Sequence, residues 1–448
     1  MIGYLKETNN MIAKIENSVP FIDGLEEFNS RLQNNSPLWL NQLRTSGLSR
    51  FKELGIPTTK EEEWKYTNIA RLMEHRFQIS TVHEINEQEA FNQYCSPKEI
   101  NIVFVNGIFA PTLSNLKNFP KGVVISHLQD AIRNNDKDLA AFFKKIEAKD
   151  TESFLSLNNA LFQNGAFVRV DPKIIVEPLI HIIHVTSSSN TEVISCPRSI
   201  MILGKSAEAK ILESHVAFSP IVYFSNAVAD CLLAEDSKLL YCKAQNESRQ
   251  SFHIETTRGW QERNSQLHTF SLSVGGMLTR NNLHISLNGE GAGAILNGLY
   301  CVNEKQHVDN HTSVDHCVPN CTSNQLYKGI LNDSSRAVFN GKIFVRKDAQ
   351  QTNSYQLNKN LLLGRDCRVD TKPQLEIFAN DVKCTHGATI GQLNEDEIFY
   401  LQSRAIPKSS AIKLLARGFV DDILNTIGND AITSKLNKLL APTFSALK

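Results

Sequence analysis

Cys384 and His386 are the two side chains best suited to chemistry, and they stand in residues 371–391, TKPQLEIFANDVKCTHGATIG. This segment mixes Leu, Ile, Phe and Val with polar residues after a Lys-Pro break, which predicts short strands with a tight bend at Asn380-Asp381. Residues i and i+2 of a strand share a face, so both side chains should project together. A thiolate beside an imidazole suits an iron or cluster ligand pair. The competing interpretation is a buried cysteine with a hydrogen-bonded histidine at a strand end.

A second group of candidate ligands is richer in histidine: His307, His311, His316, Cys317 and Cys321. Two histidines at i and i+4 suit one face of a helix, but this stretch is strand-like and lacks the Cys-x-x-Cys pair of a zinc ribbon. We therefore favour loop and interface histidines over a zinc site.

Two glycine-containing segments imitate nucleotide-binding loops. Gly204-Lys205-Ser206 resembles the end of a P-loop, but Ser199 stands where the first glycine of that motif is required. Residues 289–294 approach a dinucleotide fingerprint, but a strand pattern follows where a helix is needed. We interpret both as turns, and the sequence supports no catalytic set of nucleophile, base and orienting acid.

The elements around these motifs are mostly strands. From about residue 167 short apolar runs follow one another between polar breaks, without a helix-length pattern, which argues against a doubly wound sheet. A weak repeat of polar turn, small residue and alternating apolar residues recurs at Ser237, Ser265, Gly291 and Ser335, and we assign the wider last spacing to an insertion. Such a repeat predicts the stacked rungs of a parallel β-helix, with a β-sandwich as the alternative.

Helical patterns flank the strands on both sides. Near the N-terminus, a helix is predicted to start at Ser36-Pro37 and to stop at Gly55, and a hairpin strand to precede Asn106. Near the C-terminus, Asn394 can cap a first helix, and an apolar stripe predicts a second one. The chain is therefore divided into a helix-rich region, a β-helix core and a C-terminal helical region, at residues 1–160, 161–393 and 394–448.

The bulk composition narrows the class of protein. The 448 residues include 47 Lys and Arg and 47 Asp and Glu, and this zero net charge argues against a nucleic-acid or membrane-surface binder. No window approaches the ~18 consecutive apolar residues of a membrane span, and no secretory signal pattern is seen. Nine scattered cysteines do not form a disulfide framework. We expect a cytoplasmic protein with free thiols.

Three segments together carry a family resemblance: SVDHCVPNCTSNQLYKGILNDSSRAVFNG at 313–341, DAQQTNSYQLNKNLLLG at 348–364 and EDEIFYLQSRAIPKSSAIKLLARGF at 395–419. With residues 371–391 they resemble, in order and spacing, the SufB/SufD family of iron–sulfur cluster assembly proteins, SufD branch. The tract EEWKYT at 62–67 is a weaker echo. The resemblance implies a right-handed parallel β-helix and so favours that fold over the sandwich.

The resemblance also implies a role for the first pair of residues. In this family SufD is a non-catalytic partner of SufB and of SufC, an ABC-type ATPase, and Cys384 and His386 match its KC-x-HGAT-x-G motif near the SufB interface. SufB-type chains carry a His-Glu-Ala run and a cysteine before a Leu-Leu-Gly segment. Here those places hold Cys-Thr-His-Gly and Asn358, so SufB's own ligands should be missing.

The partners expected from the resemblance are a SufB-like protein and a SufC-like ABC ATPase, and a homodimer could form in isolation. SufC docking is expected on the C-terminal helices, at Phe399, Tyr400, Arg404, Leu415 and Phe419. A cluster usually takes about four protein ligands, so we expect no metal or cofactor in the isolated chain and a transient iron–sulfur cluster in the complex. The alternative is a stand-alone β-helix enzyme acting on a polysaccharide-like substrate.

Overall fold

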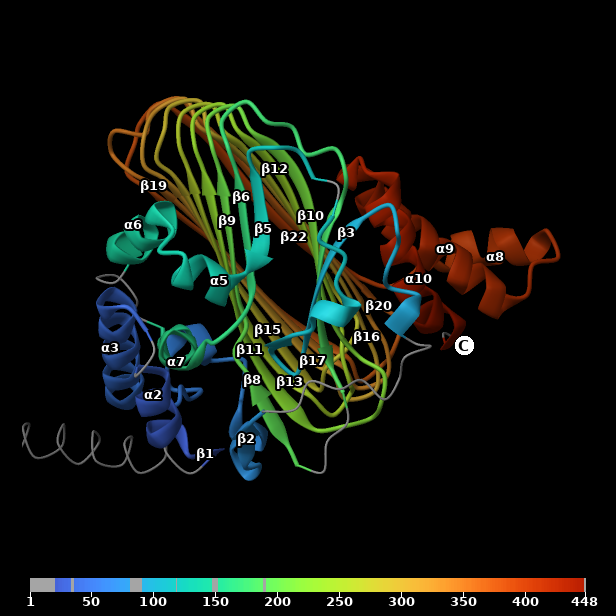
Figure 1. Cartoon of the computed structure of the whole chain (residues 1–448). Coiled ribbons are helices and arrows are strands. Elements are labelled where there is room, and N and C mark those ends of the chain that lie inside the picture. The colour runs from blue at the N-terminus through green and yellow to red at the C-terminus, as the bar shows by residue number, and fades with distance from the viewer. Residues whose placement is uncertain are drawn as a thin grey trace, which may run out of the picture.

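The chain winds into a parallel β-solenoid of about seven turns, in which successive strands alternate between two sheets. This architecture comes from a computed structural model that describes residues 21–33, 36–80, 91–117, 119–146, 152–187 and 191–446. In Figure 1 the two sheets face each other, with the N-terminal helices outside one and the C-terminal helices outside the other. The predicted parallel β-helix is confirmed, and the sandwich is excluded because sequential rungs pair in parallel.

Ten strands form the first sheet, which we call sheet I. In chain order they are β3 (Ile100–Val105), β4 (Ile108–Phe109), β7 (Ile180–Thr186), β10 (Glu208–Ala217), β12 (Lys238–Asn246), β14 (Gln266–Ser273), β16 (Gly293–Val302), β18 (Thr322–Leu331), β20 (Thr352–Leu362) and β22 (Val382–Gly391). The antiparallel pair of β3 and β4 is the hairpin predicted before Asn106.

Twelve strands form the second sheet, which we call sheet II. They are β1 (Ile22–Asp23), β2 (Phe77–Ile79), β5 (Val123–His127), β6 (Ala166–Val170), β8 (Val193–Ser195), β9 (Arg198–Leu203), β11 (Tyr223–Leu233), β13 (Phe252–Gln261), β15 (Leu278–Leu287), β17 (His307–His316), β19 (Arg336–Val345) and β21 (Arg368–Ile377). Strands from the first 160 residues therefore join both sheets, so this helix-rich part of the chain also builds the solenoid.

The rungs are in register and turn at matching corners. In sheet I, Lys238 pairs with Gln266, and the next rungs continue in parallel. The corners leading into β10, β12, β14, β16, β18 and β20 of sheet I each hold one residue with positive φ, a conformation that glycine and Asn or Asp tolerate best. These residues are Ser206, Asp236, Asn264, Gly291, Asn320 and Gln351.

The structure corrects the interpretation of the fourth member of the sequence repeat, Ser335. Ser335 precedes β19 of sheet II, whereas Ser237 and Ser265 precede β12 and β14 of sheet I. The fourth repeat member therefore lies at the opposite edge of the solenoid, and its wide spacing is not an insertion. Both kinds of corner share a serine whose hydroxyl donates to a carbonyl three residues earlier, which explains why they look alike in sequence.

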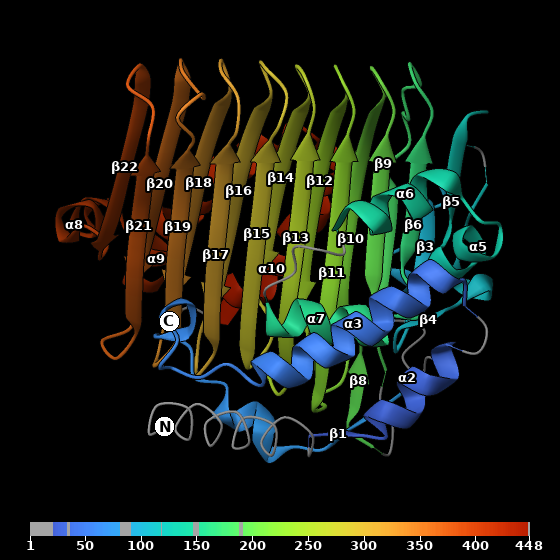
Figure 2. The same cartoon turned by 90° about the vertical axis from the view of Figure 1, so that its left-hand side faces the viewer.

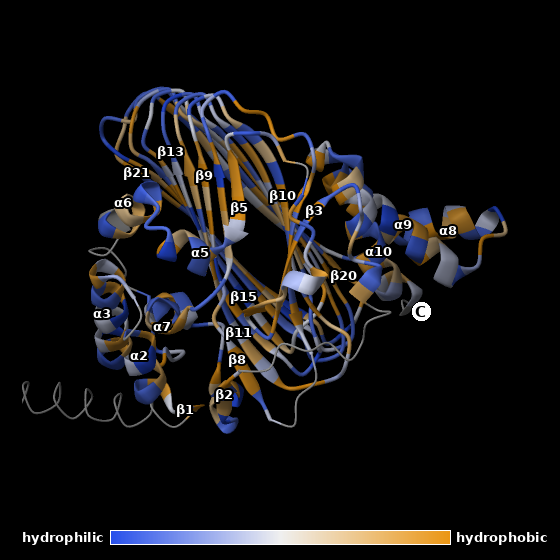
Figure 3. Ribbon diagram, in the orientation of Figure 1, coloured by the Kyte–Doolittle hydropathy of each residue, from blue (hydrophilic) through white to orange (hydrophobic). Residues whose placement is uncertain are grey.

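Alternation along each strand separates two kinds of apolar surface. Inward-facing residues such as Ile211, Leu267, Ile285 and Leu296 pack between the sheets. Outward-facing residues pack against helices, and Figure 3 shows apolar residues concentrated along the strands. Because both faces of most strands are covered, the runs are more continuously apolar than those of a one-sided sheet.

The N-terminal helices cover the outer face of sheet II. They are α2 (Leu25–Gln33), α3 (Leu38–Leu54), α5 (Leu128–Arg133), α6 (Lys137–Ile146) and α7 (Ser153–Leu161), with the short turns η1 (Glu62–Trp64), η2 (Ala70–Glu74) and η3 (Pro111–Leu113). Helix α3 ends before Gly55, whose φ is 66°, as predicted. Residues 128–146 have helical spacing of apolar residues, and Asn135 at φ 50° divides this stretch into α5 and α6.

The C-terminal helices are α8 (Glu395–Ser403), α9 (Lys408–Leu424) and α10 (Asp430–Ala446), with η4 (Asn425–Ile427) between the last two. Asn394 caps α8 by accepting the Asp396 amide at 2.9 Å, as predicted. Helices α9 and α10 lie along the outer face of sheet I, where Val420 and Leu436 pack with Phe270. They cover the side of the solenoid rather than its last rung, and α8 projects away from it in Figure 1.

Candidate functional site

The last rung leaves one end of the solenoid open. Strand β21 pairs with β19 and β22 pairs with β20, and among the described strands neither has a partner on its other side. Figure 2 shows these two strands at the end of the stack. Unpaired backbone donors and acceptors along an edge strand are a template for pairing with another chain. This end is therefore the part of the solenoid best able to bind a second sheet.

Cys384 and His386 both lie on β22, with Cys384 opposite Ser354 and His386 opposite Gln356 of β20. The predicted strand pair and the bend between β21 and β22 are confirmed. As i and i+2 residues the two side chains share one face, about 7 Å apart along the strand. The structure thus brings the predicted pair together at the open end, where a partner's ligands could join them.

The two side chains differ in environment. Cys384 is half-buried and packs with Ile343, Val345 and Ala349. Burial raises the pKa of its thiol, so the free chain favours the thiol over the thiolate that binds metal. His386 is exposed to solvent. The imidazole is therefore the more available ligand of the two before a partner binds.

Large apolar residues surround this end. Ile377, Phe378 and Ile390 are exposed there, and the Phe378 ring lies 5.3 Å from that of Phe344. A group of exposed apolar side chains beside unpaired strand edges is typical of a protein–protein contact.

Helix α8 presents a second exposed surface. Phe399 and Tyr400 project from it, and the guanidinium of Arg404 lies 5.3 Å from the Tyr400 ring centroid. Leu415 on α9 is half-buried, and Phe419 packs against sheet I, where its ring lies 4.5 Å from the ammonium of Lys328. Three of the five predicted docking residues are therefore on a free surface, while Phe419 contributes to internal packing. Leu414, which sequence reasoning missed, is also exposed.

The histidine-rich segment does not form one site. Thr67 lies 2.9 Å from His307, and His311 lies 3.1 Å from Glu63, both on the outside of sheet II. His316 lies on the other face of β17, and its Nε2 lies 3.0 Å from the hydroxyl oxygen of Ser323. The three histidines therefore have separate partners, and they lie on strand β17 rather than in a loop.

The acidic-aromatic tract at 62–67 docks onto sheet II. Arg280 pairs with Asp309 at 2.7 Å and lies 3.8 Å from the ring centroid of Trp64, and Thr67 donates to Asp309 at 2.5 Å. Nearby, Glu152 Oε1 lies 2.7 Å from His284 Nε2. Trp64, Arg280, Glu152 and His284 line a cavity of about 370 Å³ between the N-terminal region and the solenoid.

The turn interpretation of the two glycine-containing segments is confirmed. Ser206 occupies a positive-φ corner, and Lys205 pairs with Glu235 of the next rung at 2.7 Å. Residues 289–292 form the corner before β16. None of the described helices is both long and apolar enough to cross a membrane.

The chain belongs to the class of parallel β-solenoid proteins, here with helical flanks and one open end. Stacked rungs, and not a catalytic pocket, are the defining feature of this class. A family model described as SUF system FeS cluster assembly, SufBD core domain, matches residues 184–419, and one for the SufBD protein N-terminal region matches residues 15–182. The chain belongs to the SufBD family of iron–sulfur cluster assembly proteins, as the sequence resemblance indicated.

Relatives extend over most of the chain. An iron–sulfur cluster assembly SufBD family protein of Synechocystis is 31% identical over 397 residues, covering 87% of each chain. The iron–sulfur cluster assembly protein SufD of Escherichia coli is 30% identical over 87% of this chain and 89% of its own. SufD of Bacillus subtilis is 23% identical over 92% of this chain and 95% of its own.

Sequence reasoning passed over a group of polar residues inside the solenoid. His184 of β7 and His215 of β10 stand opposite each other on neighbouring rungs. Both histidines share a strand face with core residues. His184 is two positions after Ile182, and His215 is four positions after Ile211, with Glu213 between them. A histidine recurring after one rung at an inward position is the signal that would have found them.

Proposed function

We propose that this chain is a SufD-like, non-catalytic scaffold subunit that supports iron–sulfur cluster assembly at an interface with a SufB-like protein, driven by a SufC-like ATPase. The open last rung carries this proposal, because Cys384 and His386 share one face of its edge strand β22. Two side chains supply about half the ligands of a cluster. A partner on the same edge would supply the others, so the cluster is a shared and transient cargo.

Pairing with the SufB-like partner can be tested at the apolar end of the last rung. Ile390 of β22 is 47% exposed, and Ile175, at the other end of the solenoid, is 51% exposed. A charge in an edge-to-edge interface is costly because it loses water on binding. We expect Ile390→Asp to weaken capture of a co-expressed SufB-like protein at least tenfold, while Ile175→Asp leaves it unchanged. Equal capture by both variants would contradict pairing through this end.

We propose that α8 contacts the ATPase, because its aromatic pair Phe399 and Tyr400 is largely exposed. Phe399 is 72% exposed, whereas Leu38, at the start of α3 on the opposite side, is 74% exposed. We expect Phe399→Ala to reduce capture of a SufC-like ATPase without affecting the SufB-like partner, and Leu38→Ala to change neither. Retention of full ATPase binding by the double variant Phe399→Ala/Tyr400→Ala would argue against this placement.

Deletion of residues 396–448 is a less informative test. It would remove α9 and α10, whose Val420, Ile423 and Leu436 cover Phe270 and Leu299 of sheet I. The exposed apolar face would favour aggregation. Loss of binding by that truncation would therefore not separate docking from folding.

The alternative function, a stand-alone β-helix enzyme, would have its site in the cavity beside sheet II. There the acids already have partners, since Glu63 contacts His311 and Glu152 contacts His284. This pairing favours a structural role for the cavity. Turnover of a polysaccharide by the purified chain, lost on His284→Ala, would support the enzyme instead of the scaffold.

A further inference from the structure

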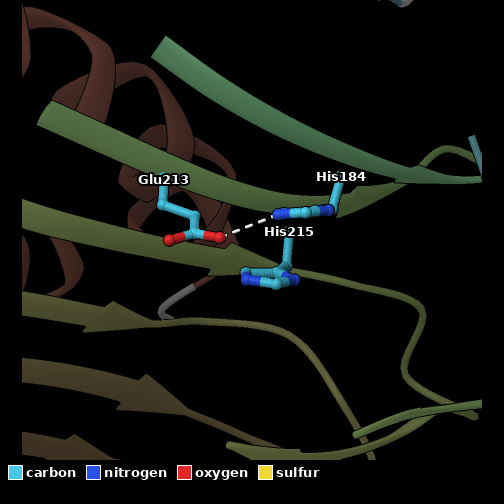
Figure 4. Close-up of side chains that lie close together, drawn as sticks. All are labelled: His184, Glu213 and His215. Atoms are coloured by element: carbon cyan, nitrogen blue, oxygen red, sulfur yellow. Dashed lines mark hydrogen bonds and ion pairs between the residues drawn. The ribbon is translucent and has the colours of Figure 1, made fainter. Parts of the chain in front are cut away.

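A group of ionisable residues lies inside the solenoid, away from the open end. His184 belongs to β7, Glu213 and His215 to β10, and all three are almost completely buried. Their potential ligand atoms lie within 4.8 Å of one another. Figure 4 shows the two imidazole rings one above the other, beside the carboxylate of Glu213. Ring centroids are 4.7 Å apart, with an angle of 15° between the planes.

Surrounding residues hold the carboxylate in a fixed orientation. His184 Nε2 contacts one Glu213 oxygen at 2.8 Å, and Ser199 donates to the same oxygen at 2.7 Å. Tyr241 donates to the other oxygen at 2.7 Å. Metal-binding carboxylates are commonly held by such hydrogen bonds, which orient the oxygen lone pairs.

His215 supplies the second, independent observation. It is 2% exposed, and its Nε2 has no hydrogen-bond partner among the described residues. Glu255 Oε2 lies 3.8 Å from this nitrogen, which is too long for a hydrogen bond. A buried polar nitrogen without a partner is costly, and here it points into a cluster of metal-ligand atoms.

The neighbouring acids leave the interior negatively charged. Lys243 contacts Glu255 at 2.9 Å, and His253 lies between Glu247 at 2.8 Å and Glu255 at 3.0 Å. The carboxylates of Glu213, Glu247 and Glu255 thus share this part of the interior with the single ammonium group of Lys243. A further positive charge would be stabilised inside the solenoid.

We propose that His184, Glu213 and His215 form a buried site for one divalent first-row transition-metal ion. Two imidazoles and a carboxylate are a donor set typical of zinc and iron(II). Tetrahedral bonds of ~2.1 Å place ligand atoms roughly 3.4 Å apart, so the more distant atoms must approach by about 1 Å and the contact of His184 with Glu213 must lengthen. The alternative triad His215, His253 and Glu255 is less suitable, because the Lys243 ammonium lies 2.9 Å from its carboxylate and would repel a metal ion there.

The site is distinct from the shared cluster at the last rung and does not depend on a partner. Its two histidines stand opposite each other on neighbouring rungs, so an ion would link β7 to β10 within sheet I. It would act on this chain alone, as an internal connection between rungs.

The test uses the full-length chain, stripped with a chelator and incubated slowly with Co²⁺, which reports nitrogen and oxygen ligands through its visible spectrum. We expect about one Co²⁺ per chain, displaced by Zn²⁺, with a higher midpoint of urea unfolding. Glu213→Gln and His215→Gln should each weaken Co²⁺ binding by at least ~100-fold. Matched controls are His181→Gln, a buried histidine on the other face of β7, and His386→Ala, an exposed one.

Two outcomes would overturn the proposal: no tight Co²⁺ or Zn²⁺ binding by the natural chain, or binding that survives both ligand substitutions. If those variants do not fold, X-ray absorption of the Zn²⁺-loaded natural chain decides instead. Two imidazole nitrogens with carboxylate oxygen would support the site, whereas sulfur ligands would refute it. Cluster assembly in the complex is measured separately, so failure here leaves the scaffold proposal unaffected.

Discussion

Asp230, on β11, is the shared carboxylate partner of Arg198 and Arg258, and Arg198 contacts the helices that cover sheet II. Arg198 NH2 reaches it at 2.9 Å and Arg258 Nε at 2.7 Å, and Asp230 and Arg198 are completely buried. The Arg198 guanidinium also lies 4.9 Å from the ring centroid of Phe143 and 5.2 Å from that of Phe162. The triad therefore links sheet II to the helices that cover it. We predict that Asp230→Asn destabilises this half of the protein strongly.

The magnitude follows from what remains after the substitution. At an effective dielectric constant of ~20, each ion pair at these distances has a gross attraction of about 6 kcal/mol. Desolvation offsets several kcal/mol for each ion, so the pairs themselves add little net stability. Removing only the acid leaves Arg198 and Arg258 buried without that acid's charge. Breaking a buried pair in this way typically costs about 3–5 kcal/mol, and we expect that loss here.

The assay is equilibrium urea unfolding followed by tryptophan fluorescence. Trp39 packs on Phe143, with ring centroids 5.1 Å apart, and Arg258 lies 5.1 Å from the Trp260 ring, so both report on this contact. The matched control is Glu235→Gln, because Glu235 also bridges two cations but at an exposed corner. Exposed pairs contribute about 0–1 kcal/mol. Equal losses for the two variants, or a loss below ~1 kcal/mol for Asp230→Asn, would refute the reasoning.

Three further predictions concern the proposed cluster interface, acid stability and nucleotides. His386→Ala should leave the three-protein complex intact but strongly lower its iron and sulfide after anaerobic reconstitution; Cys384→Ser should have a smaller effect, and Thr385→Val, on the opposite face of the strand, none. A normal cluster yield from an intact His386→Ala complex would return both residues to a structural role. Burial alone would raise the pKa of Glu152, but His284 and nearby arginines lower it to about 2, so its stabilisation is complete above its ordinary pKa and lost as pH falls from ~5 toward 2. Because about a third of this side chain is exposed, we expect its charge to contribute roughly 1 kcal/mol to the free energy of unfolding. Between pH 5 and pH 3 the stability of Glu152→Gln should therefore decline less steeply than that of the natural chain, and parallel curves would contradict the assignment. The isolated chain should bind ATP negligibly by calorimetry, and saturable micromolar binding would show that a nucleotide site was missed.

The sequence by itself determined the local elements and the family. Gly55 ends α3, Asn394 caps α8, and the bend after Ile377 separates β21 from β22, because each depends on a few neighbouring residues. Caps, positive-φ corners and strand alternation are short-range effects, so they can be predicted from the sequence without knowledge of the fold. The pairing of Cys384 with His386 on one face follows from the same alternation. Ordered motifs over much of the chain then indicated the SufBD family, which the family models confirm.

Only the tertiary structure decided which segments meet. Corners at both edges of the solenoid use the same serine turn, so Ser335 could not be assigned to its edge from spacing alone. An amphipathic pattern says that α9 and α10 are covered on one side, but not that sheet I covers them. His184 and His215 become neighbours because each rung returns the chain to the same place. Whether a residue faces inward depends on the register of every preceding rung, and a shift of one position would reverse it.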